Sequence, residues 1–150
     1  MIYTRRATLA MLAATAAMSA PAYAAKAPVF SKNGIAINGY DPVAYFTQSK
    51  PVKGKKSYSA KHNGATFLFS SAENKAKFES NTAKYAPQYG GYCAYAVSKG
   101  ATAKTDPNAW SIENGKLYLN YNRDVRSIWE QDIPGNIKRA NANWPYVLKK

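Results

Sequence analysis

The chain of 150 residues has few of the side chains on which most protein chemistry depends. It contains one cysteine, Cys93, one histidine, His62, and 8 acidic residues against 21 lysines and arginines. One cysteine excludes an internal disulfide, and together with one histidine it falls short of the four ligands of a structural zinc site. No carboxylates pair convincingly, no serine lies in an elbow motif and no glycine-rich loop suits a phosphate. We therefore predict no catalytic residues, and the sequence disfavours an enzyme.

Long hydrophobic runs are also missing, apart from a short one at the N-terminus. Arg5-Arg6 precedes an apolar run over residues 7–18, and the small residues A-Y-A end this region at positions 22–24. The run is shorter than the roughly 20 residues of a membrane span, and the whole pattern is typical of a secretory signal peptide. We predict a signal peptide over residues 1–24 and a mature protein in the periplasm. The arginine pair leaves both the Sec and the twin-arginine route open.

The shortage of acidic residues makes the chain strongly basic. Its formal charge is +13, and loss of the two arginines in residues 1–24 leaves 19 basic and 8 acidic residues, or +11. Lysines spread over a surface favour solubility and a weak attraction to anions. In the periplasm these anions are lipid headgroups and envelope polymers, so nucleic acid is not an expected partner. Without disulfides, stability must come largely from buried aromatic side chains.

Two Asn-Gly dipeptides organise the mature chain. Asn63-Gly64 and Asn114-Gly115 each separate two strand-like segments, and Asn-Gly supplies the positive φ angles of a tight hairpin turn. A capping residue and a helical pattern follow each hairpin, with Ser70 or Ser71 in the first case and Asn122 in the second. Both units place a large aromatic residue, Phe78 or Trp129, 14 positions after the glycine.

This register predicts an α+β fold in which two β-hairpin-plus-helix units, about 51 residues apart, pack into one small domain with additional short helices. The alternative to a duplication is that the two hairpin-helix segments resemble each other by chance. We expect residues 25–34 to be a flexible start and residues 35–150 to form the domain. The additional helices are expected after Asp41, over residues 89–99 and from Pro134.

The chain resembles the YHS domain family in the segments "GYDPVAYF" and "NGATFLFSSAENKAKFESNTAKYAPQYGGYCAYA". More narrowly, the later segments "DPNAWSIENGKLYLNYN" and "ANANWP" are similar to those of exported bacterial YHS proteins. The resemblance covers roughly residues 35–145 and implies a small α+β module. It also implies an association with heavy-metal binding, although it gives the fold more securely than an activity.

Metal-associated YHS modules carry three cysteines that this chain lacks. Their positions correspond to Ala44, Ser70 and Asn74, and none of these residues is a soft ligand of the kind that selects copper(I) or zinc. The usual metal site of the family is therefore absent. Some exported relatives are described as selenoproteins, and their selenium position aligns with Cys93, which favours a chemical role for this thiol.

The expected position of Cys93 gives that role a physical basis. If a helix begins just after Gly90-Gly91, the thiol lies in its first turn, where free N–H groups stabilise a thiolate and lower its pKa. The alternative is a small buried side chain between the tyrosines and the hairpins. Tyr89, Tyr92 and Tyr95 recur at helical spacing. This spacing is typical of core packing, but the tyrosine hydroxyls can also line a pocket near the thiol. We predict that Tyr40 and Asp41 line the same pocket.

We therefore expect a periplasmic, non-enzymatic YHS-type protein that binds a soft metal ion, copper first, through Cys93 with His62 as a second ligand. His62 precedes a hairpin turn, where an exposed polar residue is also ordinary. A thiol redox protein based on Cys93 is the second hypothesis, although no resolving cysteine is available. The third is a metal-free module that docks on another envelope protein. The oligomeric state and the identity of any ligand are left open by the sequence.

Overall fold

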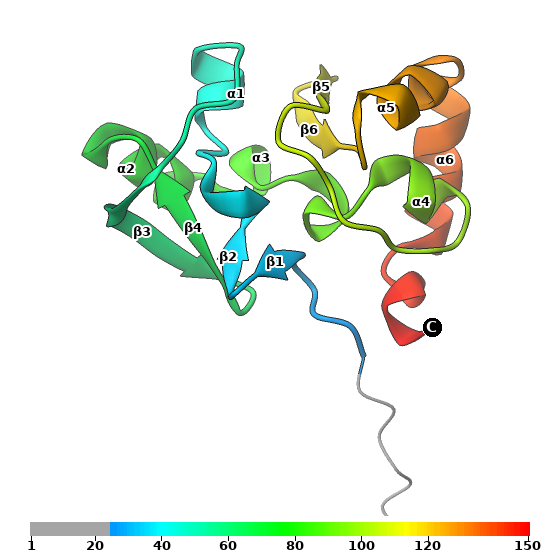
Figure 1. Cartoon of the computed structure of the whole chain (residues 1–150), viewed down its shortest axis with the longest axis horizontal. Coiled ribbons are helices and arrows are strands. Elements are labelled where there is room, and N and C mark those ends of the chain that lie inside the picture. Colours follow the sequence, from blue (N-terminus) through cyan, green and yellow to red (C-terminus); the bar gives the residue numbers. More distant parts are fainter. Residues whose placement is uncertain (1–24) are drawn as a thin grey trace, which may run out of the picture.

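The computed structural model describes residues 25–150, so the predicted signal peptide lies outside the described residues. Figure 1 shows two groups of elements side by side. The strands are β1 Ser31–Lys32, β2 Ile35–Ala36, β3 Lys55–His62, β4 Ala65–Phe69, β5 Trp110–Glu113 and β6 Lys116–Leu119. The α-helices are α1 Ala44–Thr47, α2 Ala72–Ser80, α3 Thr82–Tyr85, α4 Ala94–Ser98, α5 Arg123–Glu130 and α6 Ile133–Asn143. Three 3₁₀ segments complete the fold, η1 Ile37–Gly39, η2 Gln88–Gly91 and η3 Tyr146–Lys149.

Both predicted hairpins are present, and the predicted α+β fold is confirmed. β3 and β4 pair around the Asn63-Gly64 turn, and β5 and β6 pair around Asn114-Gly115, with all four turn residues at positive φ. The first hairpin extends to a four-stranded sheet of order β1-β2-β4-β3, in which β2 runs parallel to β4. The second hairpin forms a separate two-stranded sheet.

The helices after the two hairpins begin in the same way. The Ser71 side chain caps α2 by accepting from the Asn74 amide, and the Asn122 side chain caps α5 by accepting from the Val125 amide. One helix further on, Asn81 and Asp132 are the N-caps of α3 and α6. Their backbone angles are nearly identical, with φ −151° and ψ 65° against φ −150° and ψ 68°.

The duplication also extends upstream of the hairpins. Ile37, Asn38 and Gly39 have φ angles of 53°, 49° and 85°, and Tyr89, Gly90 and Gly91 have φ angles of 55°, 61° and 81°. Each run is a left-handed turn, closed by a bond from the Tyr40 amide to the Ile37 carbonyl or from the Tyr92 amide to the Tyr89 carbonyl. We call residues 37–85 the first copy and residues 89–143 the second copy.

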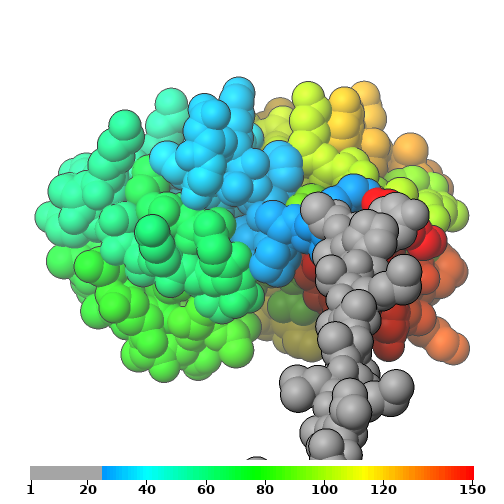
Figure 2. Space-filling model, turned by 90° about the horizontal axis from the view of Figure 1, so that it is seen from below, coloured from blue at the N-terminus to red at the C-terminus, as the bar shows by residue number. Residues whose placement is uncertain are grey.

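Strand β6 joins the cores of the two copies. Leu117 and Leu119 pack into the core of the first copy, whereas Tyr118, on the opposite face, packs into the core of the second. The N-terminal segment does the same, because Val29 belongs to the first core and Phe30 packs on the second. Figure 2 shows this segment in blue, at the seam between the two halves of the molecule.

The structure differs from the sequence-based expectation in two segments. Residues 25–34 are packed rather than free, because the Lys26 amide bonds to the Leu148 carbonyl, the Phe30 amide bonds to the Gly90 carbonyl and β1 pairs with β2. The expected helix over residues 89–99 is wrong in its first part, because the left-handed turn replaces it and α4 begins only at Ala94. Within residues 25–150, no helix has the length and apolar character needed to span a membrane.

Candidate functional site

The fully buried carboxylate of Asp41 organises the first copy. Its Oδ1 accepts from the amides of Val43 and Ala44 at 2.8 and 3.4 Å, at the start of α1. Its Oδ2 accepts from the Ser70 amide, the Ser70 hydroxyl and the Asn74 side chain at 2.8, 2.8 and 2.7 Å. Five donors therefore replace the water that this buried charge has lost.

Cys93 takes the equivalent place in the second copy. The Ser70 amide donates to Asp41, and the Tyr121 amide, 51 residues later, donates to Cys93 Sγ at 3.3 Å. The backbone matches as well: the amide of Asp41 bonds to the Val52 carbonyl, and the amide of Cys93 bonds to the carbonyl of Ala103. Each residue follows a Gly-Tyr pair and precedes a short helix, α1 or α4. The thiol thus serves as a structural acceptor where the first copy has a carboxylate.

The thiol is closed to solvent, contrary to the expected activated cysteine. Cys93 is 1% exposed, and its Sγ lies 3.5 Å from Asn120 Oδ1. Burial raises the pKa of the Cys93 thiol, and this effect exceeds the lowering by the amides of Ala96, Tyr121 and Tyr95. The expectation of a lowered pKa is wrong because the N-terminus of α4 stabilises a thiolate less than the loss of water destabilises it.

The positions of the missing YHS cysteines come together around Asp41. Ser70 and Asn74 bond to the carboxylate and to each other, with 3.2 Å between Asn74 Nδ2 and Ser70 Oγ, and the Ala44 amide completes the group. These donors satisfy the carboxylate with hard, protonated groups. They do not fit copper(I), which favours thiolates. Within residues 25–150, no group of three or more histidine, cysteine or acidic side chains is arranged to hold a metal ion.

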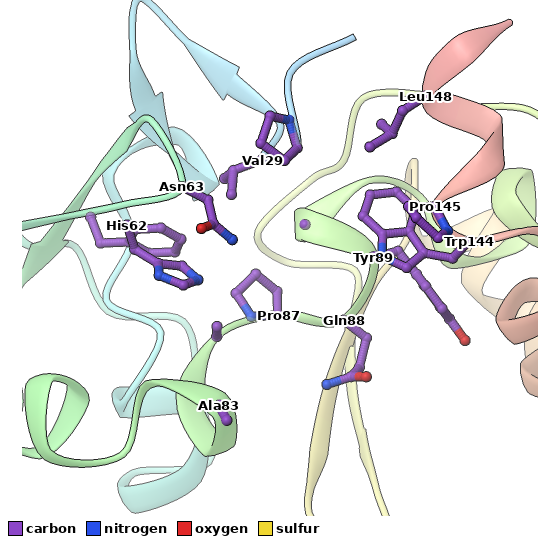
Figure 3. A pocket seen from close by; sticks show the side chains of 14 residues that line it. Val29, His62, Asn63, Ala83, Pro87, Gln88, Tyr89, Trp144, Pro145 and Leu148 are labelled. Carbon is purple, nitrogen blue, oxygen red and sulfur yellow. The ribbon is translucent and has the colours of Figure 1, made fainter. Parts of the chain in front are cut away.

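A cleft of about 320 Å³ lies where the two copies and both terminal segments meet. In Figure 3, His62 and Asn63 lie on one side of it, and Tyr89, Trp144 and Leu148 lie on the other. Its lining has no charged side chain and consists of Pro28, Val29, His62, Asn63, Phe67, Ala83, Ala86, Pro87, Gln88, Tyr89, Gly90, Trp144, Pro145 and Leu148. Aromatic walls with a few polar groups are typical of small-molecule sites.

The walls of the cleft are fixed by packing and by hydrogen bonds. The half-buried His62 ring lies 6.0 Å, between centroids, from Phe67 and from Phe78. Across the cleft, Tyr89 packs against Trp144 with ring centroids 6.0 Å apart, and its hydroxyl donates to Asn141 Oδ1 at 2.9 Å. Burial raises the pKa of the Tyr89 hydroxyl, so this group stays a neutral donor at physiological pH. Both faces are thus held in position before any ligand binds.

Gly90 forms the part of the wall where the N-terminal segment crosses. A side chain on Gly90 would collide with the backbone of Pro28 and Val29, and its φ of 61° is left-handed. The glycine therefore lets residues 28 and 29 approach closely enough to close this end of the cleft.

The structure separates the two expected metal ligands. His62 belongs to the aromatic surroundings of Phe67 and Phe78, whereas Cys93 bonds to Asn120 and to the Tyr121 amide. The two share no partner, and only His62 lines the cleft.

The expected pocket-lining residues are similarly divided. Tyr89 lines the cleft, whereas Tyr92 is buried and its hydroxyl donates to the Ala27 carbonyl at 2.7 Å. Tyr95 is half-buried beside Lys99, with Nζ 5.3 Å from its ring centroid, and Tyr40 packs on the first core. Asp41 is enclosed by its own donors. The tyrosines therefore form no common pocket around the thiol.

Three other hollows, of about 450, 420 and 510 Å³, are larger than the cleft. Each is lined by at least one lysine, and none contains histidine or tryptophan. They are consistent with the basic surface that the composition predicts. Among these four hollows of residues 25–150, the cleft combines aromatic walls with a histidine.

Comparison with known proteins identifies a YHS domain at residues 43–89. Domains of this family are generally associated with metal binding, including copper. The matched residues run from the start of α1 to Tyr89, which is most of the first copy, and the exported branch of the family stays a prediction. No curated protein and no solved structure matches the chain.

A second sign of the duplication is present in the sequence, upstream of the hairpins. Gly39-Tyr40-Asp41 and Gly91-Tyr92-Cys93 are 52 residues apart and differ only in the third residue, which precedes a short helix in each copy. The cleft left no comparable sign, because Val29, His62, Tyr89 and Trp144 come from four distant segments.

Proposed function

We propose that this protein is an exported, non-enzymatic binding protein that takes a small, uncharged and partly aromatic ligand in the cleft between its two copies. The observation that carries the proposal is a cleft of about 320 Å³ whose lining combines Tyr89, Trp144 and Phe67 with the His62 and Asn63 side chains and no charged group. Such a lining favours a flat, neutral ligand, because an ion would lose its water without gaining a partner.

His62, together with the Asn63 and Gln88 amides, provides polar groups that can orient such a ligand. Its ring is packed against Phe67 and Phe78, with 6.0 Å between the ring centroids in each case. An imidazole offers one donor and one acceptor in its neutral form. The aromatic walls then provide contact area for the ligand, and hydrogen bonds to His62 orient the ligand in the cleft.

Export brings the protein to the compartment where its ligand is to be found. The arginine pair, the apolar run and the A-Y-A segment before Lys26 support a cleaved signal peptide, and the single cysteine suits an oxidising compartment. N-terminal sequencing of the protein recovered from a periplasmic extract tests this part, with Ala25 as the expected first residue. An intact N-terminus and retention in the cytoplasm would refute it.

The test of binding uses the protein purified from its native compartment without denaturation. Native mass spectrometry is expected to show a bound species of small mass, which organic solvent releases. His62→Ala should reduce its occupancy, and at least tenfold weaker rebinding is expected if one or two hydrogen bonds are lost. Lys61→Ala, an exposed neighbour in β3, serves as the matched control. Equal binding by both variants would contradict the role of His62.

A soft metal ion, copper first, held by Cys93 is the second candidate function. It is supported by the general association of YHS domains with metal binding, although the matched residues 43–89 end before Cys93, and by the Tyr121 amide, whose bond to Sγ stabilises negative charge on the sulfur. Binding would require the second copy to open, because the thiol is 1% exposed. Competition for copper(I) against a chromogenic chelator, with wild type and Cys93→Ser compared, decides this candidate. Equal and weak binding by both proteins would remove it.

A further inference from the structure

Two buried nitrogen atoms in the described part of the chain have no hydrogen-bond partner. They are Asn120 Nδ2 and Trp129 Nε1, and both side chains are 0% exposed. A buried donor without a partner costs about 1–3 kcal/mol. Proteins usually avoid this cost by enclosing a water molecule that makes two to four hydrogen bonds.

The duplication indicates that these two donors lie together. Asn120 and Trp129 follow Phe69 and Phe78 by 51 residues, and the Phe69 and Phe78 rings are in contact, with centroids 5.0 Å apart. A second aromatic contact of Phe78 has an equivalent in the second copy. Phe67 lies 5.0 Å from Phe78, and its counterpart Tyr118 lies 5.4 Å from Trp129. At the positions of these two phenyl rings, the second copy has the amide of Asn120 and the indole of Trp129.

The orientation of the Asn120 amide is fixed by its other atom. Asn120 Oδ1 accepts from the Tyr95 amide at 3.0 Å and lies 3.5 Å from Cys93 Sγ. Exchanging the oxygen and the nitrogen would set two donors, Nδ2 and the Tyr95 amide, against each other. The unpartnered Nδ2 is thus a consequence of the fold, because the Tyr95 amide already holds the oxygen of the same side chain.

We propose that the second copy encloses a binding site for one water-sized hydrogen-bond acceptor, held between Asn120 Nδ2 and Trp129 Nε1 next to Cys93. The ligand is a water molecule, whose oxygen accepts one bond from each nitrogen and whose protons remain free to donate. Together, Asn120 and Trp129 are smaller than Phe69 and Phe78, because asparagine falls short of phenylalanine by more than tryptophan exceeds it. The first copy has no such site, since Phe69 and Phe78 carry no donor.

This site is independent of the proposed ligand in the cleft, because neither Asn120 nor Trp129 lines the cleft. It gives Cys93 a polar neighbour inside a closed core. The thiol would then face a mobile donor and acceptor as well as the fixed amide of Tyr121.

The test is magnetisation transfer from water to the indole proton of Trp129 in the nitrogen-15-labelled full-length protein. Trp129→Phe identifies the resonance among the three tryptophans. We expect a cross-peak with the sign of a long-lived bound water, and a crystal structure at high resolution should show density within hydrogen-bond distance of both nitrogens. No cross-peak at Trp129 together with no density would overturn the proposal, and so would a crystal structure in which either nitrogen bonds to the protein instead.

Discussion

Cys93 occupies in the second copy the position that Asp41 occupies in the first. Each follows a left-handed turn and a tyrosine, and each accepts a bond from the amide that follows the second hairpin strand, at 3.3 Å for the thiol and 2.8 Å for the carboxylate. The two copies thus use the same left-handed turn and the same backbone hydrogen bond to join a short helix to a hairpin. They differ in the charge of the acceptor and in the number of its donors.

Removal of the Asp41 carboxylate should destabilise the protein strongly. Asp41→Ala leaves the Val43 amide, the Ser70 amide and the Asn74 side chain without their acceptor inside the core. We expect the free energy of unfolding in urea to fall by about 3 kcal/mol or more, since each unpaired buried donor costs about 1–3 kcal/mol. Asp124→Ala, an exposed residue of α5, is the control and should cost under about 1 kcal/mol. Similar losses in both variants would contradict the role of Asp41.

Substitution of Cys93 should follow the rules of a structural acceptor. Cys93→Ala removes the sulfur from a packed core and leaves the Tyr121 amide unpaired, so we expect a loss of about 2 kcal/mol in unfolding free energy. Cys93→Ser keeps an acceptor and should lose less. If alanine is tolerated better than serine, the sulfur acts only as an apolar filler and the comparison with Asp41 does not hold.

The pH dependence of stability should contain a contribution from Cys93. Burial raises the pKa of the folded thiol above its unfolded value of about 8.5. The folded state therefore keeps the proton longer, and the stabilisation is complete below about pH 8.5 and is lost as the pH rises through the folded pKa. Urea unfolding of wild type and Cys93→Ser across this range should show a steeper decline for wild type. Parallel curves would indicate a thiol with an ordinary pKa.

Burial should also make the thiol slow to alkylate. At pH 7.5 we expect the folded protein to react with iodoacetamide far more slowly than the urea-unfolded chain, because Cys93 is 1% exposed and protonated. The redox hypothesis predicts the reverse, a folded thiol that reacts at least as fast as an unfolded one. The ratio of the two rates therefore separates a structural cysteine from a reactive one.

Restoring cysteines at the YHS positions should create a metal site. Ser70 and Asn74 already converge on Asp41, with 3.2 Å between their side-chain atoms. Ser70→Cys with Asn74→Cys would place two thiols beside a carboxylate, a donor set that suits zinc. We expect this double variant to bind one zinc ion, as measured by titration calorimetry, whereas Ser70→Ala with Asn74→Ala should not. No gain of binding in a folded double-cysteine variant would show that the two positions do not form a site.

The elements that local chemistry determines could be predicted from the sequence. The two Asn-Gly turns, a cap at Ser70 or Ser71, the cap at Asn122 and the 14-residue spacing to Phe78 and Trp129 predict the duplicated α+β fold. The structure places the first cap at Ser71, because Ser70 bonds to Asp41 instead. The turn at Tyr89 could not be predicted in this way, because a bulky residue at positive φ contradicts its own local preference. Tertiary contacts, such as the Phe30 amide to the Gly90 carbonyl, stabilise it instead.

The site was harder to predict than the fold, for two physical reasons. A helix N-terminus lowers the pKa of a nearby thiol, and this local effect can be predicted from the sequence. At Cys93 it is outweighed by desolvation, which raises the pKa and depends on Asn120 and the second core, far away in the sequence. The cleft depends on the approach of segments up to 120 residues apart, from Pro28 to Leu148. Of the residues that line the cleft, the sequence predicts only His62 and Tyr89 as site residues, and it assigns them to a metal site at Cys93.

A titration with 2-naphthol tests most directly whether a preformed, neutral cleft lies between the two copies. Binding is measured from the indole N–H resonances of the tryptophans. Trp144 lines the cleft, while Trp129 is buried in the second core and serves as an internal control. We predict a saturable shift of the Trp144 resonance and no shift of the Trp129 resonance. In His62→Ala, the Trp144 shift should be weaker or absent. A saturable shift of the Trp129 resonance with none at Trp144 would contradict this prediction and would place the binding site in the second core, away from the cleft.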